Sequence, residues 1–139
     1  TMIMLPEDVK GRFLRYGFKF FGLNEKEISR RLFMNKQEIK SLFLAGMTIG
    51  GHSHNHFTFD ISNKDVMQKD LRLSKEILFD LLGVQPEIFS YPHGRHSLVA
   101  LDVLASEGFK YALTIDRRGV AAADGNFLLP RYDTTDIIF

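Results

Sequence analysis

Apolar and polar positions follow a repeated order along most of the chain: a helical stretch, a glycine, then a short apolar run. Apolar residues at helical spacing predict helices over residues 36–45, 62–82 and 97–107. A glycine follows each of these helices, as is common at helix C-termini. The apolar runs that come next predict strands at residues 47–49, 88–89 and 111–115.

Polar residues that suit helix N-termini precede these helices. Asn35 and Glu38 have the spacing of a capping box, in which each side chain bonds to the other residue's backbone N–H. Ser62 with Asp65 predicts a second cap, and Ser97 a third. The sequence therefore gives each predicted helix both a start and a stop.

Three helix-to-strand units with short links predict an α/β fold, in which helices cover a parallel sheet. The pattern of residues 7–33 also predicts helix, and the many aromatic side chains there suit contacts with a core or with a partner. We expect one domain over residues 1–139. A sheet of three or four strands leaves the first strand, at 47–49, with an open edge. A second copy of the chain could pair with that edge, or the helices of 7–33 could cover it. Self-association is favoured, because a helix cannot satisfy the hydrogen bonds of a strand.

Composition and charge argue against several classes of function. The 139 residues carry 18 basic and 17 acidic side chains, a balance that predicts neither a nucleic-acid nor an anionic-membrane partner. No apolar run approaches the roughly 20 residues of a membrane span. Residues 1–6 are too short for a signal peptide, and Thr1 ahead of Met2 suggests a fragment. We expect a cytoplasmic rather than a periplasmic location. Cysteine is absent, so any metal would need imidazole and carboxylate ligands.

A histidine cluster directly follows the predicted strand 47–49. His52, His54 and His56 fall within five residues, at a strand end where parallel α/β folds place their sites. Two metal geometries are open. An extended segment would put all three rings on one face, whereas a helical turn would bring only His52 and His56 together. Either set suits zinc with an open position for water.

Further polar motifs end the later strands. Pro92 and Gly94 form a turn after residues 88–89, which can aim a backbone N–H into a site as an oxyanion donor. Asp116 follows the strand at 111–115, and Arg131 lies in the closing segment 129–136. Their common position after successive strands makes them candidates for the same site.

These motifs, in this order, resemble the polysaccharide deacetylase family, also called the NodB homology domain. Gly50-Gly51-His52-Ser53-His54-Asn55-His56 is similar to its His-Ser/Thr-x-x-His metal motif, and Ser90-Tyr91-Pro92-His93-Gly94 to its next motif. The segment 129–133 resembles the closing part of members linked with surface-polysaccharide biosynthesis. The resemblance covers residues 34–136 and assigns 34–139 to a partial domain behind a helical segment, 1–33.

The resemblance implies an incomplete (β/α) barrel and a divalent metal, most often zinc. It implies a hydrolase that removes N- or O-linked acetyl groups from a sugar or polysaccharide. The implied metal ligands are His52 and His56, and the implied catalytic groups are the backbone N–H of His93 and the side chain of Arg131, which would orient a carboxylate. We also expect His54, Tyr91 and Asp116 to contact the carbohydrate.

The chain also departs from the family pattern. No Asp-Asp motif, which supplies a metal ligand and the general base, precedes the histidines; the adjacent pair Glu7-Asp8 looks like a first helical turn. Ser90 stands where many members have Arg. The late Leu-x-His motif, which supplies the general acid in the family, is not evident either. His54 or His96 would have to replace that general acid.

Two alternatives follow from these departures. One is a carbohydrate-binding or interaction module that kept the fold and lost the base. The other is a metal hydrolase of the amidohydrolase type that uses His52-x-His54. The latter ranks last, because it also needs well-separated downstream histidines, and only His93 and His96 follow.

Overall fold

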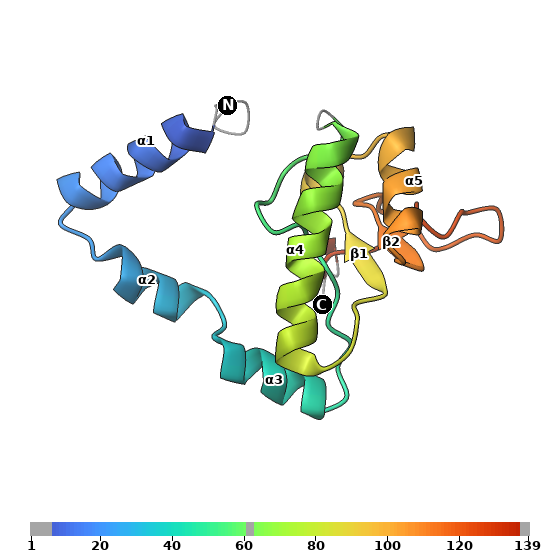
Figure 1. Cartoon of the computed structure of the whole chain (residues 1–139), viewed down its shortest axis with the longest axis horizontal. Coiled ribbons are helices and arrows are strands. Elements are labelled where there is room, and N and C mark those ends of the chain that lie inside the picture. The colour runs from blue at the N-terminus through green and yellow to red at the C-terminus, as the bar shows by residue number, and fades with distance from the viewer. Residues whose placement is uncertain (1–6, 61–62, 137–139) are drawn as a thin grey trace. The chain divides into compact units, whose positions relative to one another are not determined.

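The computed structural model describes residues 7–60 and 63–136. The chain divides into two compact units, Thr1–Ser41 and Leu42–Phe139. In chain order the elements are α1 (Glu7–Phe20), α2 (Glu25–Leu32), α3 (Lys36–Leu44), α4 (Lys64–Leu82), β1 (Ile88–Ser90), the short 3-10 helix η2 (Pro92–Gly94), α5 (Leu98–Ser106), β2 (Tyr111–Leu113) and a second 3-10 turn, η3 (Thr134–Asp136) (Figure 1).

The first unit consists of helices without a core of their own. The helix predicted over 7–33 is present but broken between α1 and α2, where Gly22 has a φ of 63° and Leu23 N–H donates to the Phe18 carbonyl at 2.8 Å. Asn24 then caps α2 by accepting from Glu27 N–H at 3.2 Å. Between residues 9 and 41, no described side chain is buried; Phe13, for example, is 61% exposed.

The capping box predicted for α3 is confirmed. Asn35 N–H donates to the Glu38 carboxylate at 2.7 Å, and Glu38 N–H donates to Asn35 Oδ1 at 3.0 Å. The helix ends at Leu44. Gly46 then turns the chain with a φ of 91°, which only glycine adopts freely, and Met47 N–H donates to the Leu42 carbonyl at 3.1 Å. Local chemistry alone therefore sets both ends of this helix.

The strand predicted at 47–49 is wrong in its position. Met47 is still engaged in ending α3, and the chain first pairs with β1 at Gly51, in a single parallel bridge to Phe89. Gly51 N–H donates to the Ile88 carbonyl at 2.8 Å, and Ser90 N–H donates to the Gly51 carbonyl at 2.9 Å. A side chain at Gly50 would lie 2.8 Å from the Ile88 oxygen, so the close approach requires glycine.

The two later helices are confirmed, with one change of cap. Asn63 caps α4 by accepting from Val66 N–H at 2.9 Å, whereas the predicted cap, Ser62, lies outside the described residues. Gly83, with a φ of 75°, ends the helix as predicted. Ser97 caps α5 as predicted, with its hydroxyl accepting from Ala100 N–H at 3.3 Å.

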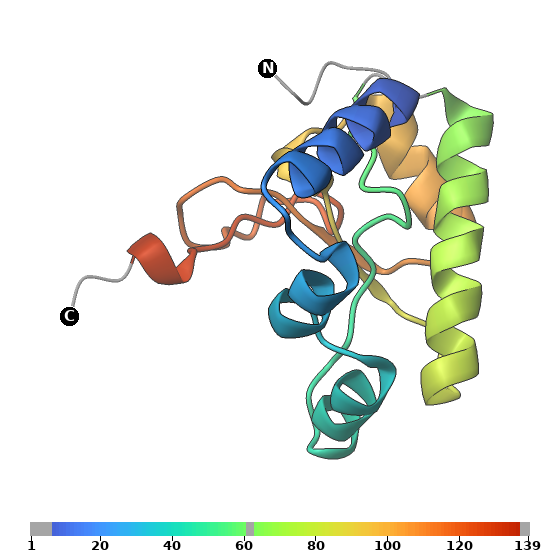
Figure 2. The ribbon, with the colours of Figure 1, turned by 90° about the vertical axis from the view of Figure 1, so that its left-hand side faces the viewer.

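A small parallel sheet and the two helices α4 and α5 enclose the core. β1 pairs with β2 in the register Ile88–Tyr111, Phe89–Ala112 and Ser90–Leu113, and β2 is bridged in turn to Leu129. α4 and α5 contact each other and lie side by side in Figure 2. The buried apolar residues are Phe59, Met67, Leu71, Phe89, Tyr91, Ala100, Val103, Leu104, Phe109 and Ala112. The predicted α/β class with a parallel sheet is confirmed.

The other face of this sheet is less covered: Ile88, Ser90 and Leu113 are half-buried there, and Tyr111 is exposed. Side chains alternate along a strand, so Ile88, Ser90, Tyr111 and Leu113 point away from the core residues Phe89 and Ala112. Two open hollows of about 490 and 330 Å³ lie along residues 43–52, β1 and β2 on the less covered side. The described residues form a parallel sheet with helices on one face, and a closed barrel stays a prediction.

Within the described ranges, 7–60 and 63–136, no helix is both long and apolar enough to cross a membrane.

Candidate metal centre

The histidine loop leaves the sheet at Gly51 and folds into a turn. Ser53 and His56 both have positive φ, 66° and 56°, and the Ser53 hydroxyl accepts from Phe57 N–H at 3.1 Å across the turn. Positive φ is uncommon for residues other than glycine. The segment is therefore neither the extended strand nor the regular helix that the sequence left open.

This turn brings His52 and His56 together. Their ring centroids lie 4.9 Å apart with an interplanar angle of 69°. His93, from the turn after β1, lies against His56 with centroids 4.7 Å apart. Within the described part of the chain, His54 makes no ring contact with either of them. The sequence analysis considered only the backbone N–H of His93 and missed its ring. The position of His93 directly after a predicted strand, as for the histidine loop, was the signal that could have indicated a ring contact.

A hydrogen bond fixes the ring of His52. Its Nδ1 lies 2.7 Å from the Ser90 carbonyl oxygen at the end of β1. A carbonyl can only accept, so Nδ1 carries the proton in this bond, and in the neutral ring the lone pair is then on Nε2. Metal-binding histidines are oriented in this way, with one nitrogen donating to the protein and the other free for a metal.

The donor chemistry suits part of a zinc site. Two neutral imidazoles at this separation can supply two of the three protein ligands that a catalytic zinc takes. Among the described residues, however, no group of three His, Cys, Asp or Glu side chains is placed to hold a metal. His52 and His56 therefore fit two ligand positions, and the chain as described does not supply the third.

The turn after β1 presents a backbone N–H at the same edge. Gly94 N–H donates to the Tyr91 carbonyl at 2.9 Å, and Arg95 N–H donates to the Pro92 carbonyl at 3.2 Å. His93, with a φ of 57°, makes no backbone hydrogen bond through its own N–H within residues 7–60 and 63–136. That N–H is thus an available donor, in a turn that also carries the His93 ring.

Tyr91 lies in the core. Its side chain is 1% exposed, packs against Phe59 and Phe89, and donates its hydroxyl to the Phe127 carbonyl at 3.1 Å. Burial raises the pKa of this phenol well above its usual range. This placement suits packing and a structural hydrogen bond better than the predicted substrate contact. The His96 ring lies against that of Tyr91, with centroids 5.0 Å apart and an interplanar angle of 33°, and its Nδ1 lies 3.1 Å from the Gly94 carbonyl oxygen.

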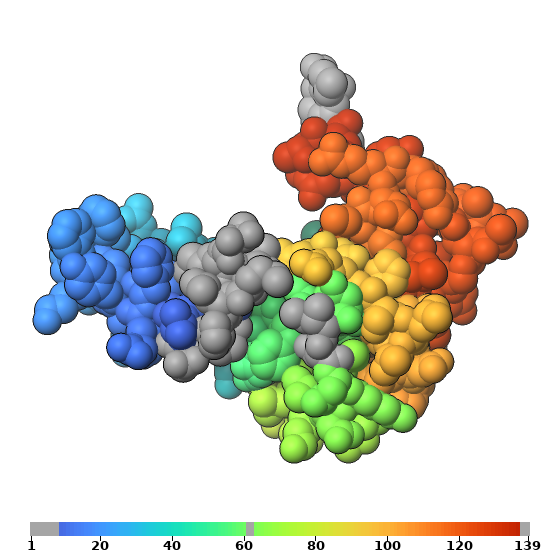
Figure 3. Space-filling model, turned by 90° about the horizontal axis from the view of Figure 1, so that it is seen from above, coloured from blue at the N-terminus to red at the C-terminus, as the bar shows by residue number. Residues whose placement is uncertain are grey.

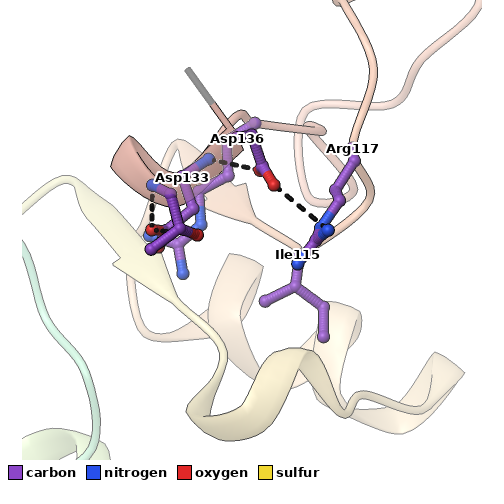
Figure 4. A pocket seen from close by; sticks show the side chains of 6 residues that line it. Ile115, Arg117, Asp133 and Asp136 are labelled. Carbon is purple, nitrogen blue, oxygen red and sulfur yellow. Dashed lines mark hydrogen bonds and ion pairs between the residues drawn. The ribbon is translucent and has the colours of Figure 1, made fainter. Parts of the chain in front are cut away.

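Arg131 is anchored at the end of β2. Its Nε donates to the Thr114 carbonyl at 3.0 Å, and its backbone N–H donates to the Asp116 carbonyl at 3.0 Å. It lines a pocket of about 280 Å³ together with Ile115, Arg117, Asp133, Thr135 and Asp136, in which Arg117 and Asp136 point toward one another at 3.1 Å (Figure 4). The exposed Asp116 adjoins this pocket through its backbone.

Hydrogen bonds set the ionisation of one pocket carboxylate. The backbone N–H and hydroxyl of Thr135 lower the pKa of Asp133, and Arg131 adds a smaller favourable charge. In the space-filling view, yellow-gold residues lie between green residues and the orange-red residues that follow α5 (Figure 3). The strand-end segments 50–57, 92–94 and 114–131 all belong to the second unit.

Comparison with known proteins gives this arrangement a context. A family model described as polysaccharide deacetylase matches residues 17–112. The chain is 22% identical over 106 residues to the Bacillus subtilis protein YxkH, whose name assigns it to the polysaccharide deacetylases. This match covers 76% of the chain and 38% of YxkH.

Solved structures agree with this match. The Streptococcus pyogenes deacetylase PplD, in complex with acetate, superposes with a TM-score of 0.70 and 25% identity over 76% of the chain and 46% of PplD. BA3943 of Bacillus anthracis, described as a CE4 family pseudoenzyme, shares the fold with a TM-score of 0.54 and 15% identity over 56% of the chain and 28% of its own. The chain spans less than half of the length of each of these relatives.

Proposed function

The chain belongs to the polysaccharide deacetylase family, and we propose that it carries the metal-binding histidines of a hydrolase that removes N- or O-linked acetyl groups from a sugar or polysaccharide. The single observation that carries this proposal is the pair His52 and His56, with rings 4.9 Å apart and Nδ1 of His52 bonded to the Ser90 carbonyl. This geometry leaves Nε2 of His52 free to bind a metal.

The chain's own residues account for part of the reaction. In acetyl hydrolysis a water attacks the carbonyl carbon, negative charge builds on the carbonyl oxygen, and the amine or alcohol leaves with a proton. A zinc ion held by His52 and His56 would act as a Lewis acid on the reacting oxygen. The free N–H of His93 is suited to donate to the developing oxyanion. Arg131, fixed through Nε on the Thr114 carbonyl, is suited to orient a carboxylate with its terminal nitrogens.

Two groups are still required: a third metal ligand and a base that takes the proton of the attacking water. The resemblance assigns both to an Asp-Asp motif ahead of the histidines, which this sequence lacks. We therefore propose that the chain alone binds zinc weakly and hydrolyses little. The open face of the β1–β2 sheet, where additional strands would pack, supports the same view.

The experiment compares this chain with a fusion that places the opening strands of a family member, including their Asp-Asp motif, ahead of it. Acetate release is measured from an acetylated glucosamine oligomer. We expect little release by the chain alone and chelator-sensitive release by the fusion, abolished by His52→Ala but not by His54→Ala. Chelator-sensitive turnover by the chain alone would contradict the proposal, because it would require a base within these residues.

A second function is a carbohydrate-binding module without catalysis. It is favoured by the absence of a third metal ligand among the residues that the structure describes, and by a pseudoenzyme among the structures that share the fold. Binding of the oligomer by both proteins, with no acetate release from the fusion, would support this alternative.

A further inference from the structure

The loop that carries the two proposed metal ligands is attached to a buried carboxylate on α4. Asp70 is 3% exposed, and its neighbours Met67 and Leu71 belong to the core. Its Oδ2 accepts from His54 N–H at 2.8 Å, and its Oδ1 accepts from Asn55 N–H at 2.8 Å and from the Asn55 amide at 2.9 Å. Both carboxylate oxygens are therefore bonded to the middle of the turn between His52 and His56.

The burial of this carboxylate has an energetic cost, which its hydrogen bonds to the loop offset. Asp70 forms no ion pair with Arg, Lys or His in the described part of the chain. A buried charge without a cation is tolerated only where several N–H groups donate to it. The three donors all come from His54 and Asn55, so the charge of Asp70 is bound to this one conformation of the loop.

That conformation needs support. His56 and Ser53 hold positive φ, a backbone conformation that is strained for a residue with a side chain. One end of the loop is held by the Gly51 bridge and by the His52 ring on Ser90. Asp70 holds the middle, and through it the core helix α4 determines where His56 returns toward His52.

We propose that Asp70 is a positioning residue of the metal centre, which holds the turn so that the His52 and His56 imidazoles meet at one metal position. This inference rests on the proposed function, since it assigns Asp70 to the same site. The hydrogen bonds of Asp70 go to the backbone of His54 and Asn55 and to the Asn55 amide, so it would act on the imidazoles through the loop.

The test uses Asp70→Asn, with Asp80→Asn as the matched control: the same change on the same helix, at an exposed position. His54 N–H and Asn55 N–H bond to different oxygens of Asp70, and asparagine replaces one of these oxygens with an NH2 donor, so one of the two N–H groups loses its acceptor. Two properties are measured on the whole chain. One is the tautomer of His52, read without metal from the ¹⁵N shifts of its ring. The other is the zinc affinity, read by titration of the His52 and His56 ring signals.

We expect Asp70→Asn to lose the Nδ1–H preference of His52 and to weaken zinc binding about tenfold or more, as supporting residues of metal sites do. Asp80→Asn should change affinity less than about twofold. Asn55→Ala removes one side-chain bond and leaves the two backbone donors, so it tests the proposal if Asp70→Asn does not fold. It should give an intermediate loss of affinity.

A lower urea midpoint for Asp70→Asn with an unchanged tautomer and zinc affinity would overturn the proposal, because Asp70 would then only stabilise the fold. Equal losses in the Asp70 and Asp80 variants would overturn it as well. If the unmodified chain binds no zinc, the proposed function fails, whereas the metal-free tautomer still decides the role of Asp70.

Discussion

The two faces of the β1–β2 sheet carry similar apolar residues but differ in what covers them. On one face Phe89 and Ala112 pack against α4 and α5 and are fully buried. On the other, Tyr111 is 42% exposed, and hollows of about 490 and 330 Å³ remain open. The proposed metal centre lies at the strand ends between them. Asp70, which holds the loop, belongs to α4 on the covered side, whereas Gly51 and His52 line the smaller hollow on the open side.

The largest expected difference between the faces concerns stability. Leu71→Ala, on the fully covered side, should cost about 2–5 kcal/mol of unfolding free energy, because a cavity is left in a closed core. Leu113→Ala, the same change on the open face, should cost less than about 1 kcal/mol. Urea denaturation measures both values. Equal losses would mean that the second face is also covered in solution.

The turn after β1 should be the next most sensitive position. Gly94 has a φ of 67°, and a Cβ there would overlap the Ile115 side chain. We expect Gly94→Ala to destabilise the chain by about 1–3 kcal/mol, through strain and overpacking together. Gly119→Ala is the control, since nothing lies within 4 Å of its added methyl group. A neutral Gly94→Ala in thermal melts would mean that this turn can rearrange freely, which would weaken the case for a fixed His93 N–H.

A smaller effect should come from the open edge before Gly51. Within the described residues, the backbone N–H groups of Thr48 and Ile49 have no hydrogen-bond partner, and such edges invite pairing with another strand. We expect concentration-dependent dimers in light scattering. Thr48→Pro, which removes one donor, should weaken the dimer about tenfold, or ~1.4 kcal/mol. Val120→Lys, at an exposed position away from the edge, should not. A monomer at every concentration would contradict the self-association proposal.

The smallest effect lies in the loop after β2, away from both faces. Arg118 and the Ala121 N–H lower the pKa of Asp124 to about 2. Because the folded pKa lies below the unfolded value of 3.8, this contribution to stability is present above that value and is lost as the pH falls toward about 2. The Ala121 amide shift should follow this titration, and Arg118→Gln should move its midpoint upward. An unmoved midpoint would show that the ion pair does not form in solution.

The elements that local chemistry fixes could be predicted from the sequence. The Asn35–Glu38 capping box and the Ser97 cap need only neighbouring residues, and both formed as expected. The strand at 47–49 could not be placed, because its pairing depends on how closely Gly50 approaches Ile88, a contact across the fold. The α/β class followed from the order of the elements, but a closed barrel depends on strands that the described residues do not contain.

The candidate site divides in the same way. The i, i+4 spacing indicated His52 and His56. The positive φ values at Ser53 and His56 that bring the rings together could not be predicted, because neither residue is a glycine. Tyr91 was assigned to substrate from its motif, although an aromatic residue at a strand end can equally face the core, as this one does. Asp70 was not singled out, because its partners are backbone N–H groups, which every sequence has.

Zinc titration of the unmodified chain, followed through the ring nitrogens of its five histidines, tests the central claim most directly. The account predicts that the signals of His52 and His56 shift together along one weak binding curve, with a stoichiometry of one zinc per chain. His54 lies in the same loop without a ring contact to either, so it should not follow them and serves as the internal control. Joint saturation of His52, His54 and His56 would contradict the account, as would zinc binding that leaves His52 or His56 unchanged.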